Sequence, residues 1–546
     1  MRMTTKPGKN MESKNSIAKT ANPNTVASRL RTICAVRLVP LLLLLTLPTV
    51  VQAQFNFTTN NDGSLNIANY TGSSANVIIP DTANGLPVTS IGTNAFYQLY
   101  SLTNVTMGSN VTSIGDHAFE FCINLTGVTI PNSVTNIGTE AFTLCSSLTS
   151  VTIPNGITFI ATSAFSACSS LTSVTIPESV TRIGDNAFSF CGSLTNVMIS
   201  TNITSIGRLT FNNDTSLTSV TIPNNVTNIG EEAFNLCTSL TSVTIPNSVT
   251  SIANFAFDFC YSLTNVTIGT HITSIGEDAF SNCTNLTSVT IPDSVSILGD
   301  FAFAYCYGLT NVTIGNGVTN FSIVFYYCTS LTSVTFGTNL TNIGGWAFAN
   351  CFALASITIP NSVTIIGNNA FENCFSLTNV TIGTNVTSIC WEAFLGCSSL
   401  TSITIPASVT NFVGSYAFNA CTRLTSVYFL GNAPSANYPL FVNADNPVVY
   451  YLLGTTGWGA MFGGALTAPW NPQVQTSGAG FGVQMNQFGF NINWASGMVV
   501  VVEACTNFAN PVWQPVQTNT LTGSSCYFND PARTNYPCRF YRLRSQ

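Results

Sequence analysis

Positive charge is scarce in this chain and is concentrated at one end. Charged residues make up 7% of the 546 residues, far below the usual quarter. All four lysines lie before residue 20, and without residues 1–53 only 7 basic residues remain against 20 acidic ones. Binding to phosphate backbones needs Lys and Arg, and anionic lipid repels an acidic chain. The composition therefore excludes nucleic acid as a partner and disfavours anionic membrane surfaces.

Signatures of catalysis are also missing. The two histidines, His117 and His271, have no partners in a recognisable catalytic order, and no HExxH, GxSxG, phosphate-binding loop or calcium-binding repeat is present. Carboxylates such as Asp116 and Glu140 are read as scattered turn residues rather than as an acid pair. We predict a protein that is not an enzyme, with no cofactor and no metal site.

The first 53 residues have the layout of a secretory leader. Eight of the 15 Lys and Arg precede residue 38, an apolar run follows over 38–47, and Val51-Gln52-Ala53 supplies small residues. This pattern predicts a signal peptide over 1–53, with Met11 as an alternative start. The apolar run is short for a bilayer span, so no stable membrane span is expected after cleavage. The alternative is an uncleaved membrane anchor.

A repeat of about 23 residues fills most of the remaining chain. One copy contains Leu240-Thr-Ser-Val-Thr-Ile245, then Val249, Ile252, Ala256-Phe257 and Cys260. A fixed period of this length predicts a solenoid, in which stacked coils share one continuous core. The leading leucines lie at 102, 125, 148, 171, 194, 217, 240, 263, 286, 309, 331, 354, 377, 400 and 424.

Each repeat is expected to form one coil. The alternation of Leu, Val and Ile with polar residues predicts a short strand with one buried face. The later Gly allows a tight turn, and the segment around Ala-Phe-x-x-Cys predicts a helical turn or a short helix. Acids gather after that Gly, where a helix dipole would favour them: Asp116, Glu140, Asp185, Glu231, Glu277, Asp278 and Asp300.

The repeat and its edges predict the domain organisation. We expect an N-terminal cap and a first degenerate coil over 54–101, followed by an array of repeats of 22–24 residues over 102–430. A C-terminal cap is expected over 431–473, because terminal coils must cover the exposed core edge. Short strand-like runs between turn residues then predict a small β-sandwich-like domain over 474–546.

Thirteen of the 18 cysteines share one position of the repeat, an arrangement interrupted by Asp214. Each of these cysteines would have two equivalent cysteine neighbours, so the sequence specifies no disulfide pairing. Because Cys also packs well as a small buried residue, free buried thiols are favoured over disulfides. One ligand per coil also gives no tetrahedral metal cage. These column cysteines are Cys122, Cys145, Cys168, Cys191, Cys237, Cys260, Cys283, Cys306, Cys328, Cys351, Cys374, Cys397 and Cys421.

The motif Leu-x-x-Val-x-Ile-Pro-x-x-Val-x-x-Ile-Gly-x-x-Ala-Phe-x-x-Cys resembles the BspA-like leucine-rich repeats of bacterial surface and secreted proteins. The resemblance covers about residues 75–430, with departures at Asp214, Cys390 and Phe321-Ser322. It implies a curved leucine-rich-repeat solenoid, with a parallel strand ladder on one side and turns and short helices on the other. It also implies roles in adhesion or protein contact, without shared catalytic residues.

Departures from the repeat are the best candidates for a binding site. The expected strand face carries uniform Ser, Asn and Thr, which would bind sugars or peptides weakly. In the later coils, however, aromatic residues replace small ones. Such residues form a recognition patch if they gather on one edge, and the alternative is that they fill gaps between coils. They are Tyr261, Tyr307, Trp346, Phe352, Phe375 and Trp391.

The sequence predicts a secreted or cell-surface repeat protein that presents an extended surface for protein–protein interaction or adhesion. Its protein or glycan ligand stays open. One alternative is a passive structural protein of the envelope or matrix. Another is a carbohydrate-binding protein that uses the strand face or the C-terminal domain. Four arginines of that domain would face the acidic repeats or an anionic wall polymer, or form a solvated edge: Arg533, Arg539, Arg542 and Arg544.

Overall fold

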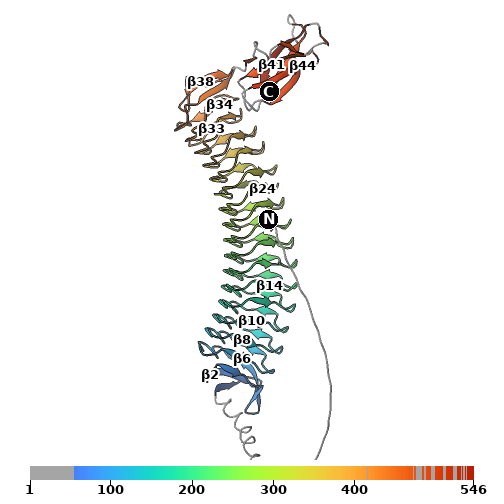
Figure 1. Cartoon of the computed structure of the whole chain (residues 1–546), viewed down its shortest axis with the longest axis vertical. Coiled ribbons are helices and arrows are strands. Elements are labelled where there is room, and N and C mark those ends of the chain that lie inside the picture. Colours follow the sequence, from blue (N-terminus) through green and yellow to red (C-terminus); the bar gives the residue numbers. More distant parts are fainter. Residues whose placement is uncertain are drawn as a thin grey trace, which may run out of the picture. The chain divides into compact units, whose positions relative to one another are not determined.

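The computed structural model describes residues 54–546 apart from 415, 471–472, 475–481, 485–486, 494–498, 508–511, 521–524, 531, 533–534, 537 and 546. The predicted signal peptide lies outside the described residues. Residues 54–546 form one compact unit, in which the coils of the repeat follow one another in a single stack (Figure 1). Among the described residues, none belongs to a helix long and apolar enough to cross a membrane.

The expected strand of each coil is present. In the first strand ladder, equivalent residues of successive coils pair in parallel, as Val243 pairs with Val266. Val243 is buried while its neighbours Ser242 and Thr244 are exposed, which is the predicted alternation. The strands of this ladder are β3 (Asn76–Ile78), β6 (Asn104–Thr106), β8 (Gly127–Thr129), β10 (Ser150–Thr152), β12 (Ser173–Thr175), β14 (Asn196–Met198), β16 (Ser219–Val220), β18 (Ser242–Thr244), β20 (Asn265–Thr267), β22 (Ser288–Ile291), β24 (Asn311–Ile314), β26 (Ser333–Thr335), β28 (Ser356–Thr358), β30 (Asn379–Thr381), β32 (Ser402–Ile405) and β34 (Ser426–Phe429).

A second parallel ladder, of mostly two-residue strands, follows at the Val-x-x-Ile segment of each coil. Its isoleucines, such as Ile252 and Ile275, are buried and in register. The sequence had placed these residues inward without predicting a strand. The strands of this ladder are β5 (Leu86–Ile91), β7 (Ser113–Ile114), β9 (Asn136–Ile137), β11 (Phe159–Ile160), β13 (Arg182–Ile183), β15 (Ser205–Ile206), β17 (Asn228–Ile229), β19 (Ser251–Ile252), β21 (Ser274–Ile275), β23 (Ile297–Leu298), β25 (Asn320–Phe321), β27 (Asn342–Ile343), β29 (Ile365–Ile366), β31 (Ser388–Ile389), β33 (Asn411–Phe412) and β35 (Ser435–Ala436).

The predicted short helices are wrong. In the described part of the array, the segment around Ala-Phe-x-x-Cys consists of successive turns. The residues just before Ala and just before Cys have positive φ, as at His117 (56°) and Phe121 (59°). Their amides bond the next coil, as His117 N does with Thr139 O at 2.9 Å. A left-handed residue costs about 1–2 kcal/mol, and a bond between coils offsets that cost.

Because no helix forms there, a helix dipole does not explain why acidic residues follow the repeat Gly. Asp116 Oδ1 accepts the amide of Thr139 at 2.8 Å, and Asp185 Oδ1 accepts the amide of Arg208 at 2.9 Å. Each carboxylate thus bonds the backbone of the next coil. The close approach of neighbouring coils also explains the Gly. A Cβ at Gly230 would lie only 2.6 Å from the backbone nitrogen of Arg208 in the preceding coil.

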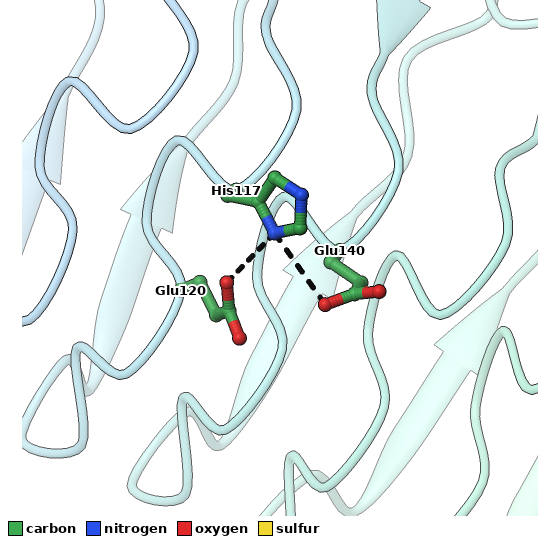
Figure 2. A group of neighbouring side chains, drawn as sticks. All are labelled: His117, Glu120 and Glu140. Atoms are coloured by element: carbon green, nitrogen blue, oxygen red, sulfur yellow. Dashed lines mark hydrogen bonds and ion pairs between the residues drawn. The ribbon is translucent and has the colours of Figure 1, made fainter.

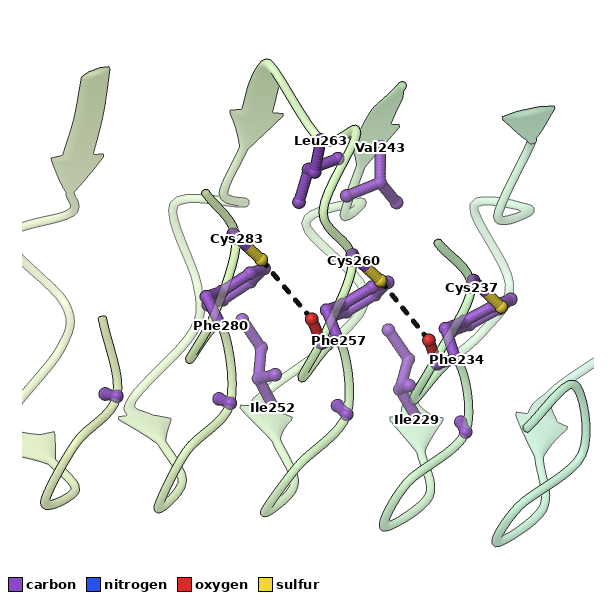
Figure 3. Packing of buried hydrophobic residues seen from close by; sticks show 14 of the residues in the cluster. Ile229, Phe234, Cys237, Val243, Ile252, Phe257, Cys260, Leu263, Phe280 and Cys283 are labelled. Carbon is purple, nitrogen blue, oxygen red and sulfur yellow. Dashed lines mark hydrogen bonds between the residues drawn. The ribbon is translucent and has the colours of Figure 1, made fainter. Parts of the chain in front are cut away.

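Phenylalanine and cysteine columns form the core beside the turns (Figure 3). One Phe per coil is fully buried, and the rings of successive coils stack with centroids 4.7–5.9 Å apart and planes within 16°. Each column cysteine is a buried free thiol. Its Sγ donates to the Phe carbonyl of the preceding coil, as Cys260 does to Phe234 O at 3.3 Å. The expectation of free buried thiols is confirmed.

Caps close both ends of the stack. At the start, β1 (Phe55–Thr59) pairs antiparallel with β2 (Leu65–Tyr70), and β2 pairs in parallel with β5; β4 (Thr82–Ala83) pairs with β5. Tyr70 stacks on Phe96 at 5.3 Å and so covers the first ring of the column. At the other end, β36 (Val448–Leu452) and β38 (Ala465–Trp470) extend the first ladder, and β37 (Met461–Phe462) pairs with β38.

The C-terminal part is all β, as predicted. One antiparallel sheet contains β39 (Gln473–Val474), β40 (Gly482–Gln484), β41 (Gln487–Asn493) and β44 (Ser525–Asp530); the other contains β42 (Val499–Cys505), β43 (Gln514–Thr520) and β45 (Phe540–Ser545). Phe490 and Ile492 of the first sheet share a buried cluster with Val500 and Val502 of the second. The proposed domain boundaries themselves stay predictions.

Candidate functional site

Six aromatic rings from four successive coils lie together at the turn side of the array. We call Tyr305, Tyr307, Tyr326, Tyr327, Phe352 and Phe375 the aromatic surface. The local fold places them there, because each lies one or two residues before, or one residue after, a buried column cysteine. Tyr305 and Tyr327 occupy the left-handed position before Cys, with φ of 58° each. The repeat therefore buries the cysteine and leaves its neighbours at the surface.

Ring contacts link these residues across the coils. Tyr305 contacts Tyr307 at 6.4 Å and stacks on Tyr327 at 5.7 Å. Tyr327 contacts Tyr326 at 4.7 Å and Phe352 at 6.2 Å. Phe352 then stacks on Phe375, with ring centroids 5.0 Å apart. The rings thus form one continuous surface, and Tyr307 and Phe375 at its two ends remain 44% and 43% exposed.

Only some of the six predicted binding residues are connected by ring contacts in the structure. Tyr307 and Phe352 are connected through Tyr305 and Tyr327, and Phe352 connects to Phe375. Trp346 lies near Glu372, whose pKa it lowers slightly, but no ring contact links Trp346 to the aromatic surface among the described residues.

Tyr261 and Trp391 are exposed as expected, but no ring contact links either to the aromatic surface among the described residues. Tyr261 lies two coils before Tyr307, with Thr284 at the equivalent position of the coil between them, and its own ring contact is with Phe259 at 5.9 Å. The recognition role of all six predicted residues stays a prediction.

Sequence reasoning missed Tyr305, Tyr326 and Tyr327. The predicted residues either follow the column cysteine or, for Trp346 and Trp391, are tryptophans of the same coils, whereas these three tyrosines occupy the two positions before the cysteine. A signal was present in the sequence. Tyr326 and Tyr327 belong to the coil shortened to 22 residues between Leu309 and Leu331, and so the surface is centred on the one coil in which the period contracts.

Carboxylates border the aromatic surface. Burial raises the pKa of Tyr305, and the nearby Tyr307, Tyr327 and Asp278 raise it further. Burial likewise raises the pKa of Tyr326, with contributions from Tyr327, Tyr305 and Glu372. Asp278 lies in the coil that bonds the coil of Tyr305, through Asn282 N and Ala304 O at 2.9 Å, and Glu372 lies in the coil of Phe375. The pKa of each carboxyl is itself raised, chiefly by burial.

A second polar cluster lies in the first coils of the array (Figure 2). His117 Nδ1 lies 2.7 Å from Glu120 Oε2 and 3.4 Å from Glu140 Oε2. The ligand atoms of the three residues all lie within 4.8 Å of one another. One nitrogen and two oxygens are donors that a divalent cation accepts, but the three groups also satisfy one another. The sequence had found no partner for His117, and the expected absence of a metal stays a prediction.

The C-terminal arginines have partners within their own part of the chain. Arg539 Nη1 lies 2.8 Å from the buried Asp530 Oδ2, and Arg542 Nη2 lies 2.7 Å from Glu503 Oε2. Arg542 also lies over the ring of Trp513, 4.5 Å from its centroid. Both arginines therefore pair within the C-terminal sheets: Arg539 is largely buried, whereas the Arg542 side chain also remains 47% exposed to solvent. Arg533 and the side chain of Arg544 lie outside the described residues.

Comparisons with known proteins agree with the repeat architecture. A solved leucine-rich repeat protein from Bacteroides ovatus ATCC 8483 is 29% identical over 69% of this chain and 93% of its own length, with a TM-score of 0.57. A solved leucine rich cell surface protein from Faecalibacterium prausnitzii A2-165 is 28% identical over 69% of this chain and 86% of its own, with a TM-score of 0.28. No curated protein matches the chain. The BspA type leucine rich repeat region matches residues 89–217, 204–323 and 322–446. The chain therefore belongs to the BspA-type leucine-rich repeat family.

Proposed function

We propose that this protein is an exported, non-catalytic scaffold that binds a partner protein through the aromatic surface. The observation that carries the proposal is the contact of six aromatic rings across four coils, with both ends of the surface exposed. Elsewhere the array covers itself largely with Ser, Thr and Asn. Partly exposed aromatic clusters are the usual anchors of protein interfaces.

Three substitutions test this role, and each introduces a residue that other coils already carry at the same position. Tyr307, Phe352 and Phe375 occupy the position after the column cysteine, where Ser146 and Ser169 lie in other coils. The triple variant Tyr307→Ser, Phe352→Ser, Phe375→Ser should therefore fold and lose its protein ligand on an array of purified extracellular proteins and glycans. Ile123→Ser is a matched control at the same repeat position, 37% exposed and outside the surface.

The outcomes separate the proposal from the alternatives. Binding of a protein that disappears in the triple variant and persists in the control supports the scaffold role. Binding of glycans by both variants alike would favour carbohydrate recognition elsewhere on the chain. Silence of the wild-type chain on the whole array would favour a passive structural role.

Export is the second part of the proposal. It rests on the basic segment, the apolar run and the small residues of 1–53 and on membership of a family with surface and secreted members. N-terminal sequencing of protein recovered outside the cytoplasm should find Gln54 as the first residue. Recovery of the chain only in membranes, with 38–47 intact, would show an uncleaved anchor instead.

A further inference from the structure

The early and late coils of the array differ in whether basic residues pair with their carboxylates. In the early coils (residues 102–239), Arg208 Nε lies 3.1 Å from Glu231 Oε2, and Arg208 Nη2 lies 3.1 Å from Glu232 Oε1. The late coils (residues 240–430) contain seven acidic residues and a single basic one, Arg423, in their last turn. Among the described residues no ion pair joins Arg423 or any other cation to these carboxylates, so a partner can still supply their counter-charge.

Three carboxylates of the late coils are partly withdrawn from water. Asp258 is buried, its Oδ1 accepts the amide of Phe259 at 2.9 Å, and burial raises its pKa to about 6. Asp278 and Glu372 are half-buried next to Tyr305 and Tyr326. A carboxylate in such surroundings gains more from an incoming cation than a fully solvated one does.

We propose that the aromatic surface binds an arginine-rich segment of the partner protein, an inference that rests on the function proposed above. A guanidinium stacks on Tyr and Phe rings and at the same time donates hydrogen bonds to a carboxylate. The aromatic surface combines both kinds of group, because Asp278 belongs to the coil before Tyr305 and Tyr307, and Glu372 belongs to the coil of Phe375. Acidic partners are repelled by the same carboxylates, and a neutral sugar could donate hydrogen bonds to them but would not neutralise their charge.

The dimensions suit an extended peptide. Four successive coils of a parallel ladder span roughly 14 Å at about 4.8 Å per coil. A peptide strand rises about 3.3 Å per residue, so four to five extended residues, roughly, cover the surface. Side chains of alternate residues on one face of such a peptide would each meet a ring.

The test uses residues 54–546 and fluorescently labelled peptides of ten arginines, ten lysines or ten glutamates. Anisotropy titrations at low and moderate salt should show tighter binding of the arginine peptide than of the lysine peptide, because guanidinium stacks better. The triple Ser variant keeps every carboxylate, and it should bind the arginine peptide about tenfold more weakly through loss of three cation–π contacts. The control Ile123→Ser should bind like the wild type.

A second variant tests the carboxylates and leaves the aromatic rings unchanged. Asp278→Asn with Glu372→Gln keeps the side-chain shapes and should weaken arginine-peptide binding several-fold, more at low salt than at moderate salt. Unchanged affinity in the triple Ser variant, with its thermal unfolding intact, would mean that general charge attraction is responsible and would overturn the proposal. Equal binding of the glutamate peptide would overturn it too.

The result also distinguishes the two proposals. If the triple Ser variant loses a ligand on the protein array but keeps its affinity for the arginine peptide, the scaffold stands and the arginine-rich partner falls. If neither the array ligand nor the peptide is lost, both proposals fall.

Discussion

In the early coils Arg208, one of two arginines, forms ion pairs with Glu231 and Glu232 of the next coil, and His117 lies within 3.4 Å of Glu120 and Glu140. In the late coils Asp278 and Glu372 lie near tyrosines, and among the described residues no carboxylate pairs with the single arginine there, Arg423. The interior of the two regions is nevertheless the same, with stacked Phe rings and buried thiols in both. The comparison teaches that the core columns make the fold, whereas the positions beside them are free to make different surfaces.

Alkaline pH should have the largest effect and should affect both regions alike. Burial raises the pKa of the Cys168 and Cys374 thiols from their ordinary 9.0 to about 12. The unfolded chain therefore ionises its thiols from about pH 9, while the folded chain keeps them protonated. Stability is complete below pH 9 and falls as the pH rises towards 12, by roughly 1 kcal/mol per thiol and pH unit.

Urea midpoints at pH 8, 9 and 10 measure this loss, summed over the column. Replacing Cys168 and Cys374 by Ala removes one thiol from each region and should make the pH dependence shallower. A midpoint that stays constant from pH 8 to 10 would contradict the buried thiol column.

Loss of one stacked ring should cost the same in either region. Phe142 of the early coils lies 5.1 and 5.4 Å from its neighbouring rings, and Phe257 of the late coils lies 5.2 Å from both of its neighbours. Both are fully buried. Phe142→Ala and Phe257→Ala should each lower the free energy of unfolding by about 3–5 kcal/mol, measured by urea denaturation. A much smaller loss at one site would show that the two cores are not equivalent.

Asp214 interrupts the thiol column just before the boundary between the regions. It is fully buried; its Oδ1 accepts the amide of Cys191 at 2.8 Å, whereas Oδ2 has no partner. Burial raises its pKa well above the ordinary 3.8. The folded chain holds this proton more tightly than the unfolded chain, so stability is lost as the pH rises above about 3.8.

Asp214→Cys should restore the column and stabilise the protein at pH 7 by about 1–3 kcal/mol, the cost of an unsatisfied buried polar group. The gain should shrink at pH 4, where the carboxyl is protonated in more of the unfolded molecules. Urea unfolding at the two pH values measures the difference, and a gain that is the same at both would refute this view of Asp214.

The smallest effect on stability is expected when an arginine is introduced into the late coils at the position that Arg208 occupies in the early coils. This change also tests most directly whether the difference between the two regions matters for binding. Asn254 occupies the position of Arg208 two coils later, with Glu277 and Asp278 in the places of Glu231 and Glu232. Asn254→Arg removes the hydrogen bond that Asn254 Oδ1 accepts from the Glu277 amide at 2.9 Å and adds an exposed ion pair that contributes little, so it should lower the free energy of unfolding by about 1 kcal/mol. It should nevertheless weaken arginine-peptide binding about fivefold by occupying Asp278. Arg208→Asn is the reciprocal control, and unchanged peptide affinity in Asn254→Arg would separate Asp278 from the binding surface.

Much of the fold was predictable because each inward residue recurs at a fixed spacing. Leu240, Val243, Ile252, Phe257 and Cys260 were all placed inside by the pattern, and all are buried. The turns were not predictable in the same way. Ala-Phe-x-x-Cys suits a helical turn locally, and only the amide bonds to the next coil make the left-handed conformation at residues such as His117 the stable one.

The candidate site shows the same division. The sequence identified Tyr307, Phe352 and Phe375 as departures from the repeat, but not Tyr305 and Tyr327, which connect them. Nor did it show that Asn369 hydrogen-bonds Glu372, or that Arg539 pairs with Asp530. Spacing along one chain says little about which side chains of neighbouring coils meet.

By itself, then, the sequence determined the period, the stacking of coils, the buried columns with their free thiols, and the acidic character of the array. These follow from hydrophobic periodicity and composition, which each repeat carries within itself. Only the tertiary structure decided the turn conformation, the second strand ladder and the ring contacts of the aromatic surface. It also decided which carboxylates have a cation beside them. The reason is that these features depend on contacts between residues about one repeat apart, and such contacts exist only when the coils are stacked.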